Sequence, residues 1–195
     1  ELLLFMDDDN LAKPHMLETF VKAYLHSKAH VYTCFNLQLY EDENPEEANR
    51  MWLPVGEALG TGIFINAFGD ANALIEKRVF FEVGGFTEDY GIGYEEYEFF
   101  TKVVLKGYRL EVIPEALYYY RVGKNSMLRT VSRFKSEFRR VRPYLFMDEK
   151  GLGVGIGYAL KLYLDTVFNL KEEARQIWED DYSRAARIFK KFWQK

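Results

Sequence analysis

The sequence has a single cysteine, Cys34, among its 195 residues, so an internal disulfide is excluded. A chain without disulfides fits a reducing compartment, and we expect a cytoplasmic protein in which Cys34 is a small core residue. The chain also lacks an uninterrupted apolar run of the roughly 18 residues that a membrane-spanning helix needs. No basic stretch precedes the apolar residues at its start, so we expect no signal peptide.

An excess of basic residues is also missing. The 26 Lys and Arg residues face 30 Asp and Glu residues, which gives a formal net charge of −4 and a pI of about 5.5. Proteins that bind nucleic acid usually have a basic surface, so we expect no nucleic-acid partner. The hydrophobic share of 48% is enough for a substantial core, and the length suits one globular domain.

The chain begins at Glu1 and enters an apolar run at once. With no methionine at the start, we expect it to be a piece of a longer polypeptide. Residues 2–6 predict a buried strand, and because both of its faces are apolar we expect it to be central in a sheet.

Three consecutive aspartates, Asp7, Asp8 and Asp9, follow this strand. In an extended chain residues i and i+2 point to the same side, so Asp7 and Asp9 can act together. Open α/β sheets bind ligands at the carboxyl ends of their strands, and paired carboxylates suit Mg²⁺ or Mn²⁺. The alternative is a solvated turn, which the following Asn10 favours.

Helices and strands alternate along the next hundred residues. We expect a helix after Pro14, a half-buried strand over 31–40, loop and strand over 60–75, and a helix over 95–106 ended by Gly107. A strand around Leu110 should end at Pro114, and another should cover 116–122. This alternation predicts an α/β fold. The apolar face of the first helix is expected to comprise Leu17, Phe20, Val21, Tyr24 and Leu25.

The C-terminal third has a different pattern. Helical periodicity over 127–142, 156–168 and 171–193 predicts an extension of about three helices, which divides the chain into 1–126 and 127–195. The first of these helices is basic, and we expect a solvated face. Peripheral contact with a membrane surface, or a lid over phosphates, is the alternative. Its basic residues are Arg129, Arg133, Lys135, Arg139, Arg140 and Arg142.

Three motifs in this order resemble the second half of a family 2 glycosyltransferase with the A-type, Rossmann-like fold. They are "FMDDDNLAKPHML", "GDANALIEKRVFFEVGGF" and "YEEYEFFTKVVLKGYRLEVIPEALYYYR", and the resemblance covers roughly residues 2–127. It implies a partial fold that lacks the first strand–helix units, which hold the nucleotide base in the family. It also implies inverting transfer of a sugar from a nucleotide-diphosphate donor, with a UDP-sugar favoured, to an acceptor hydroxyl.

The resemblance assigns roles to the metal and donor residues. Asp9 would be the main ligand of Mn²⁺ or Mg²⁺, with Asp7 in the metal shell or, together with Asp8, near the donor nucleotide. Arg121 and Ser126 fall in the segment that closes over the donor diphosphate.

The base and the acceptor side are implied in the same way. Glu96 falls at the general-base position, with Glu95 as the second candidate and Glu98 not excluded. At a helix N-terminus Glu96 should stay ionised. Gly69 and Asp70 lie in the segment on the acceptor side. Trp52 is a candidate to stack on a sugar, with burial in the core as the alternative.

Two positions depart from the family pattern. The base position holds Glu96 where relatives usually have aspartate. Gly123 stands where many relatives have a histidine, so a histidine metal ligand is not supported.

Two other functions remain open from the sequence. A haloacid-dehalogenase-type phosphatase also ends a strand in Asp-x-Asp, but Leu11 stands where that family has threonine or a similar residue. The other alternative is a non-catalytic or truncated module that binds a nucleotide or a partner.

Overall fold

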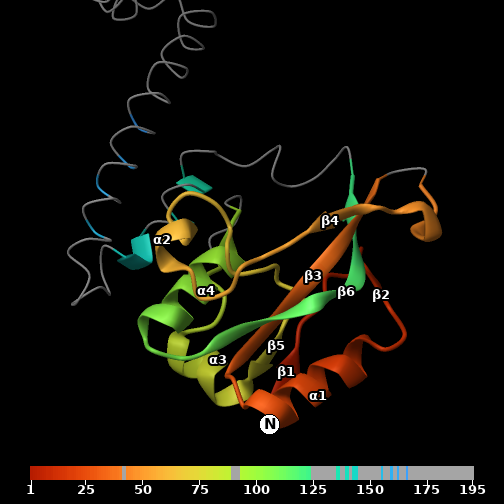
Figure 1. Cartoon of the computed structure of the whole chain (residues 1–195). Coiled ribbons are helices and arrows are strands. Elements are labelled where there is room, and N and C mark those ends of the chain that lie inside the picture. The colour runs from red at the N-terminus through yellow and green to blue at the C-terminus, as the bar shows by residue number, and fades with distance from the viewer. Residues whose placement is uncertain are drawn as a thin grey trace, which may run out of the picture.

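A mixed six-stranded sheet forms the centre of the structure, a computed structural model that describes residues 1–40, 43–88 and 93–123 (Figure 1). Further on it describes residues 135, 136, 139, 140, 142–144, 155, 159, 162 and 166. The strand order is β1-β5-β3-β6-β2, and β4 also pairs with β3. The strands are β1 (Leu2–Leu4), β2 (Leu11–Ala12), β3 (Val31–Tyr40), β4 (Arg50–Trp52), β5 (Leu74–Glu76) and β6 (Leu110–Val122).

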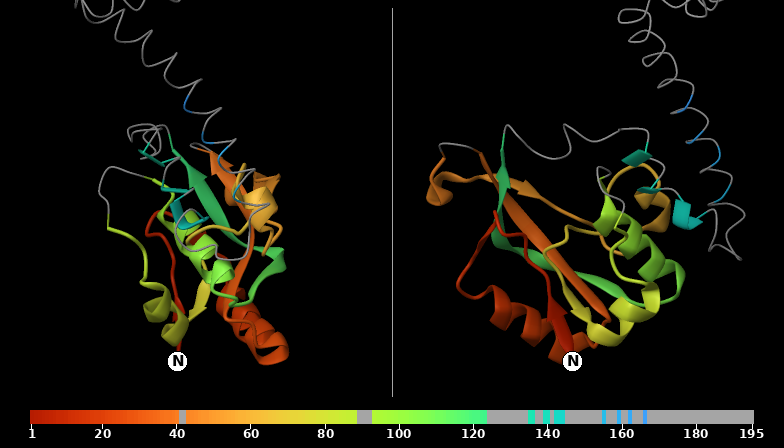
Figure 2. Two further views of the ribbon diagram at one scale, coloured as in Figure 1. Left: turned by 90° about the vertical axis from the view of Figure 1, so that its left-hand side faces the viewer. Right: turned by 180° about the vertical axis from the view of Figure 1, so that it is seen from behind.

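Helices cover both faces of this sheet (Figure 2). Neighbouring residues of a strand point to opposite faces, and Val31 packs in one apolar cluster whereas Tyr32 packs in the other. The first cluster includes residues of α3 and α4, and the second includes residues of α1, so the α/β fold class is confirmed. The helices are α1 (Met16–Ser27), a short 3₁₀ helix (Pro45–Glu47), α2 (Leu59–Gly62), α3 (Lys77–Val83) and α4 (Glu95–Leu105).

Strand β5 runs against its neighbours, and this places the candidate site. It pairs antiparallel with β1 and with β3, whereas β3 and β6 are parallel. The carboxyl end of β1 therefore lies at the start of β5, and β3 and β6 continue beyond that point in the same direction as β1. Cys34, on β3, is buried as expected, and burial raises the pKa of its thiol to about 12.

Two expectations for the strands were wrong. The opening strand covers Leu2–Leu4 and pairs only with β5 in the described part of the chain, so it lies at an edge, where Leu4 is 38% exposed. Pro114 does not end a strand, because β6 continues through it. The pairing with β3 shifts register between Cys34 and Phe35, and the proline, which has no N–H to donate, sits within that irregularity.

The expected apolar face of α1 is confirmed for Phe20 and Tyr24 and wrong for Leu17, Val21 and Leu25. Met16 and Phe20 are buried, whereas Leu17, Val21 and Leu25 are 57%, 37% and 62% exposed. Met16 and Phe20 join the cluster around Tyr32, and this contact rotates the leucines and the valine outward. Tertiary packing, rather than the number of apolar residues, therefore determines which face of α1 is buried.

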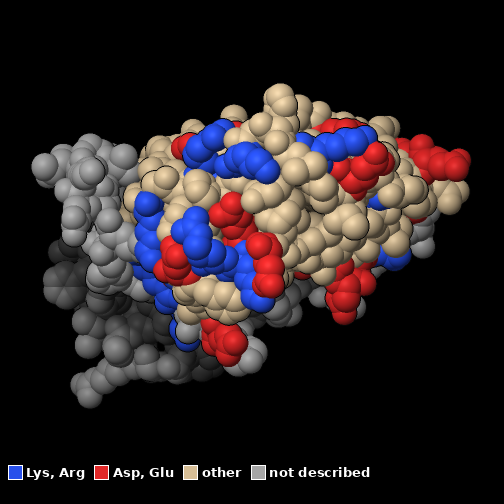
Figure 3. Space-filling view, turned by 90° about the horizontal axis from the view of Figure 1, so that it is seen from below, with Lys and Arg blue, Asp and Glu red and all other residues tan. Residues whose placement is uncertain are grey.

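Acidic and basic side chains alternate on the side of the molecule seen in Figure 3. Exposed ion pairs join Lys77 with Glu1 at 2.6 Å and, within α3, Arg78 with Glu82 at 3.2 Å. These pairs are exposed, so each contributes little to stability.

The expectation of a solvated basic face is wrong for Arg139 and Arg140, which are 2% and 5% exposed. Both pack against the domain, so neither can face a membrane surface. Arg129 and Arg133 lie outside the described residues, as do most of the predicted C-terminal helices, and the division at residue 126 stays a prediction. In the described part of the chain, no helix is both long and apolar enough to cross a membrane.

Gly69 provides a stability test of the loop that leads to β5. Its φ is +135°, and a Cβ placed on it would lie 2.3 Å from the Cβ of Thr33. Gly69→Ala should lower the free energy of unfolding by about 2–4 kcal/mol in urea denaturation, because strain and overpacking add. Gly84→Ala is the matched control, since Gly84 has a φ of +99° with no atom within 4 Å of the added Cβ. Equal losses in both variants would contradict the packing role of Gly69.

Candidate functional site

Asp7 anchors a polar cluster where β1 ends. Its backbone N–H donates to Asn72 Oδ1 at 3.0 Å, and its Oδ2 accepts hydrogen bonds from Asn10 at 3.1 Å and Asn72 at 3.4 Å. Asn10 Oδ1 in turn accepts from the backbone N–H of Arg121 at 3.0 Å. The end of β1 is thereby tied both to the segment before β5 and to the end of β6.

Asp70 joins the same cluster from the segment before β5. Its Oδ2 accepts from Asn72 Nδ2 at 2.7 Å and from the hydroxyl of Tyr118 at 2.6 Å, and that hydroxyl accepts from Asn36 at 2.9 Å. Asn72, Tyr118 and Asn36 are all buried. This chain of hydrogen bonds fixes the orientation of the Asp70 carboxylate and places it beside that of Asp7.

Negative charge is concentrated at this edge. Burial raises the pKa of Asp7 to about 6, with further contributions from Asp70 and Asp9. Burial also raises the pKa of Tyr120 to about 12, again with Asp70 among the causes, followed by Glu96. Burial is the largest cause of both shifts, and the negative charge of neighbouring carboxylates adds to each of them.

Glu96, in the first turn of α4, belongs to this acidic group. Burial, followed by the charges of Asp70 and Glu95, raises the pKa of its carboxyl to about 8, although its own backbone N–H lowers it. The expectation that Glu96 stays ionised is therefore wrong for the chain without a cation, because these effects outweigh the helix N-terminus. A carboxyl with such a pKa binds a proton readily, as a general base must.

The other glutamates of α4 are held by cations. Glu98 is 2% exposed and accepts two hydrogen bonds of 2.8 Å from Arg142, with Lys102 also at 2.8 Å. Although burial acts to raise it, these partners hold the pKa of Glu98 below its ordinary value. Glu95 pairs with Arg139 at 3.3 Å. Within the described residues only Glu96 of the three has no ion pair, so of the three it is the best candidate for the predicted base.

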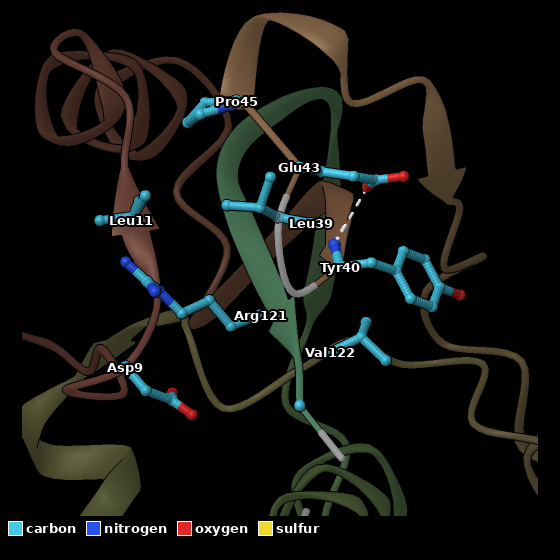
Figure 4. A pocket seen from close by; sticks show the side chains of 9 residues that line it. Asp9, Leu11, Leu39, Tyr40, Glu43, Pro45, Arg121 and Val122 are labelled. Carbon is cyan, nitrogen blue, oxygen red and sulfur yellow. Dashed lines mark hydrogen bonds between the residues drawn. The ribbon is translucent and has the colours of Figure 1, made fainter.

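A pocket of about 330 Å³ opens beside the acidic edge (Figure 4). Asp9 and Arg121 both line it, and their side chains lie on the same side of the view, with the guanidinium toward Leu11. Two residues that are 112 positions apart, and to which the family resemblance assigns the metal and the diphosphate, thus line one pocket. The volume is at the lower end for small-molecule sites. The remaining lining comprises Leu39, Tyr40, Glu43, Pro45, Val122 and Gly123.

The donor set at the end of β1 suits a hard divalent cation. Carboxylate oxygens of Asp7 and Asp9 are the ligands that Mg²⁺ and Mn²⁺ prefer, and the raised pKa of Asp7 shows that its charge is poorly compensated. Among the residues that the structure describes, no group of three or more His, Cys, Asp or Glu could hold a metal. An ion here would need further oxygens from a bound molecule, as Mg²⁺ commonly takes from substrate phosphates.

The other residues predicted for the site are not part of this cluster in the described structure. Asp8 is exposed, and Gly69 is buried against Thr33, where it has a packing role. Trp52 is half-buried on β4 opposite Asn36 and does not line the pocket. Ser126 lies outside the described residues. The sugar-binding roles of Gly69 and Trp52 stay predictions.

Asn10, Asn72 and Tyr118 were not predicted as parts of the site. Asn72 stands two residues after Asp70 in "GDANAL", and this spacing was the available signal. Nothing in the sequence places Tyr118 beside Asp70, because that contact depends on the β3–β6 pairing and the packing of the intervening loop.

Comparison with known proteins gave a family and a fold. The model of a family described as glycosyltransferase-like family 2 matches residues 1–166. No curated protein matches the sequence. The crystal structure of S. aureus TarS 1–349 in complex with UDP-GlcNAc superposes with a TM-score of 0.60 at 12% identity, over 96% of this chain and 54% of that one. A second structure of TarS 1–349 gives 0.44 at 12% identity, over 77% and 49%.

The chain therefore spans about half the length of the TarS chain it matches. At this level of identity the likeness shows the fold alone.

The raised pKa of Glu96 predicts a pH-dependent effect on stability. The folded chain binds this proton more tightly than the unfolded chain, so its contribution to the free energy of unfolding falls as pH rises from 4.5 to about 8. Without divalent metal, Glu96→Gln should be more stable than wild type by at least about 1 kcal/mol near pH 8.5, and the gain should shrink near pH 4. Urea unfolding at both pH values tests this. A gain that does not vary with pH would contradict the assignment.

Proposed function

The chain belongs to the glycosyltransferase-like family 2, and from this we propose that it transfers a sugar from a nucleotide-diphosphate donor to an acceptor hydroxyl. The donor is a UDP-sugar, the reaction inverts the anomeric centre, and it needs Mn²⁺ or Mg²⁺. The observation that carries the proposal is the convergence of Asp9, Arg121 and the Glu96 helix on one edge of the sheet. The UDP-GlcNAc named with the TarS structure supports the choice of a uridine nucleotide.

Charge is the main difficulty of this reaction. As the bond between the sugar C1 and the diphosphate oxygen breaks, its electron pair stays with the diphosphate. Asp9, together with Asp7, would hold the divalent ion, which supplies Lewis-acid stabilisation of that leaving group when bound. Arg121 lines the same pocket and would donate paired hydrogen bonds to phosphate oxygens.

The acceptor hydroxyl is a poor nucleophile until its proton is removed. Glu96 would take that proton as the oxygen attacks C1 on the face opposite the leaving diphosphate. The nearby Asp70 and Glu95 charges strengthen it as a base, because they raise its pKa. One displacement inverts C1 and needs no covalent intermediate with the protein.

A non-catalytic module remains the second candidate, because the chain spans about half of the TarS chain. Such a module would bind UDP or a partner without turnover. The family match favours the transferase over the haloacid-dehalogenase-type phosphatase. A cytoplasmic location, suggested by the lone cysteine, is part of the proposal.

Removal of the main metal carboxylate tests the proposed metal site. In calorimetric titration, wild type should bind UDP more tightly with Mn²⁺ than without it, and Asp9→Asn should lose this metal-dependent gain because its side chain is neutral. Glu18→Gln, an exposed carboxylate on α1, should keep it. Metal-dependent binding that survives in Asp9→Asn would contradict the metal assignment.

Glu96→Gln should separate binding from chemistry. The variant should bind UDP and Mn²⁺ as wild type does, because Glu96 faces the acceptor rather than the donor phosphates. The rate of UDP release from a UDP-sugar in the presence of acceptor should fall by about 10²–10⁴-fold. Turnover by Glu96→Gln at the wild-type rate would remove this residue as the base.

A further inference from the structure

The N-cap residue of helix α4, the helix that carries Glu96, provides no side-chain cap. This residue, Tyr94, makes no side-chain capping hydrogen bond and has a left-handed backbone, with φ 71° and ψ 31°. Tyr94 is one of two non-glycine residues with a positive φ in the described chain, the other being Lys28. Such a conformation persists only where surrounding contacts hold it, and it often lies at functional sites.

Two side chains from far along the sequence hold the residue before Tyr94. The backbone N–H of Gly93 donates to Ser136 Oγ at 3.1 Å, and its carbonyl accepts from Arg139 at 3.4 Å. Both hydrogen bonds are buried. Ser136 and Arg139 therefore bind both backbone polar groups of the residue that leads into the strained position.

Arg139 also binds residues before and after Gly93 in the sequence. Its guanidinium donates to the carbonyl of Thr87 at 3.4 Å and pairs with Glu95 at 3.3 Å, and Glu98 lies at 3.8 Å. The side chain is 2% exposed, so its charge is stabilised chiefly by these carboxylates and carbonyls. A planar guanidinium can bind several groups at once, which an ammonium cannot match in geometry.

These hydrogen bonds of Ser136 and Arg139 fix the orientation of the first turn of α4 relative to the site. Glu95 and Glu96 follow Tyr94 directly, and the Glu96 carboxyl lies within electrostatic reach of Asp7 and Asp70. A small rotation of this turn would move Glu96 relative to the acidic edge of the sheet, and displacements of about 1 Å can cost a reaction about 10²-fold.

We propose that Ser136 and Arg139 are positioning residues: a remote cap that holds the strained entry to α4 and sets the Glu96 carboxylate toward the acceptor. This inference rests on the proposed transferase function. Neither residue touches the donor pocket, so the cap acts on the base and not on nucleotide binding.

The same C-terminal segment offers matched controls. Tyr144 donates to the carbonyl of Leu59, on α2, at 2.7 Å, and its hydroxyl also meets Thr101, which lies further along α4 than the first turn. Arg142 binds Glu98 further into α4. Tyr144→Phe removes one hydroxyl, as Ser136→Ala does, and Arg142→Lys matches Arg139→Lys in chemistry.

The test compares these four variants in the full chain. Ser136→Ala and Arg139→Lys should lower kcat for UDP release from a UDP-sugar by about tenfold or more, while Mn²⁺-dependent affinity for UDP stays within about twofold. Tyr144→Phe and Arg142→Lys should keep both quantities within about twofold. Equal losses in all four, or none in the first two, would overturn the proposal.

Amide hydrogen exchange provides a readout that needs no activity. Ser136→Ala and Arg139→Lys should accelerate exchange across residues 93–98 by about tenfold, with Tyr144→Phe unchanged there. Protection that stays at the wild-type level would overturn the cap even in an active enzyme. Absence of turnover in wild type with accelerated exchange in the cap variants would instead contradict the transferase function and support the cap.

Discussion

Repulsion among carboxylates at one edge of the sheet is the constraint on which the rest of the structure depends. Asp7, Asp9, Asp70 and Glu96 come from three separate segments, and the fold holds them together although burial and mutual repulsion raise the pKa of Asp7 and Glu96. Asparagine and tyrosine hydrogen bonds position Asp7 and Asp70 without neutralising them. These uncompensated charges cost the fold stability, and the proposed divalent cation would offset that cost.

The α4 carboxylates that are not part of this edge are paired with basic side chains. Glu98, two residues from Glu96, is neutralised by Arg142 and Lys102 and becomes a structural anion. Glu95 pairs with Arg139, and its charge still contributes to the raised pKa of Glu96. Three glutamates in one helical turn thus have different roles because of the cations that the C-terminal segment and α4 supply. That segment is part of the domain at these residues and not a solvated face.

The sequence was sufficient for the fold class and for the main acidic residues, because strand and helix periodicity and the ordered motifs are local signals. It placed Asp9 and Arg121 in related roles, and the structure puts them in one pocket. It failed where long-range packing decides: the outward face of α1, the edge position of β1, the Asn72 and Tyr118 network, and the buried arginines. Helical spacing alone cannot say which of two apolar faces, or which arginine, a distant segment will bury.

The central claim is that the acidic end of β1 binds a divalent ion that joins the protein to a diphosphate. Anomalous diffraction from crystals of the chain grown with Mn²⁺ and UDP tests it most directly. The account predicts a manganese peak bound by Asp9 and by diphosphate oxygens, with Arg121 on the same phosphates. A nucleotide bound elsewhere, or an Asp9 carboxylate that faces solvent with no manganese beside it, would contradict it.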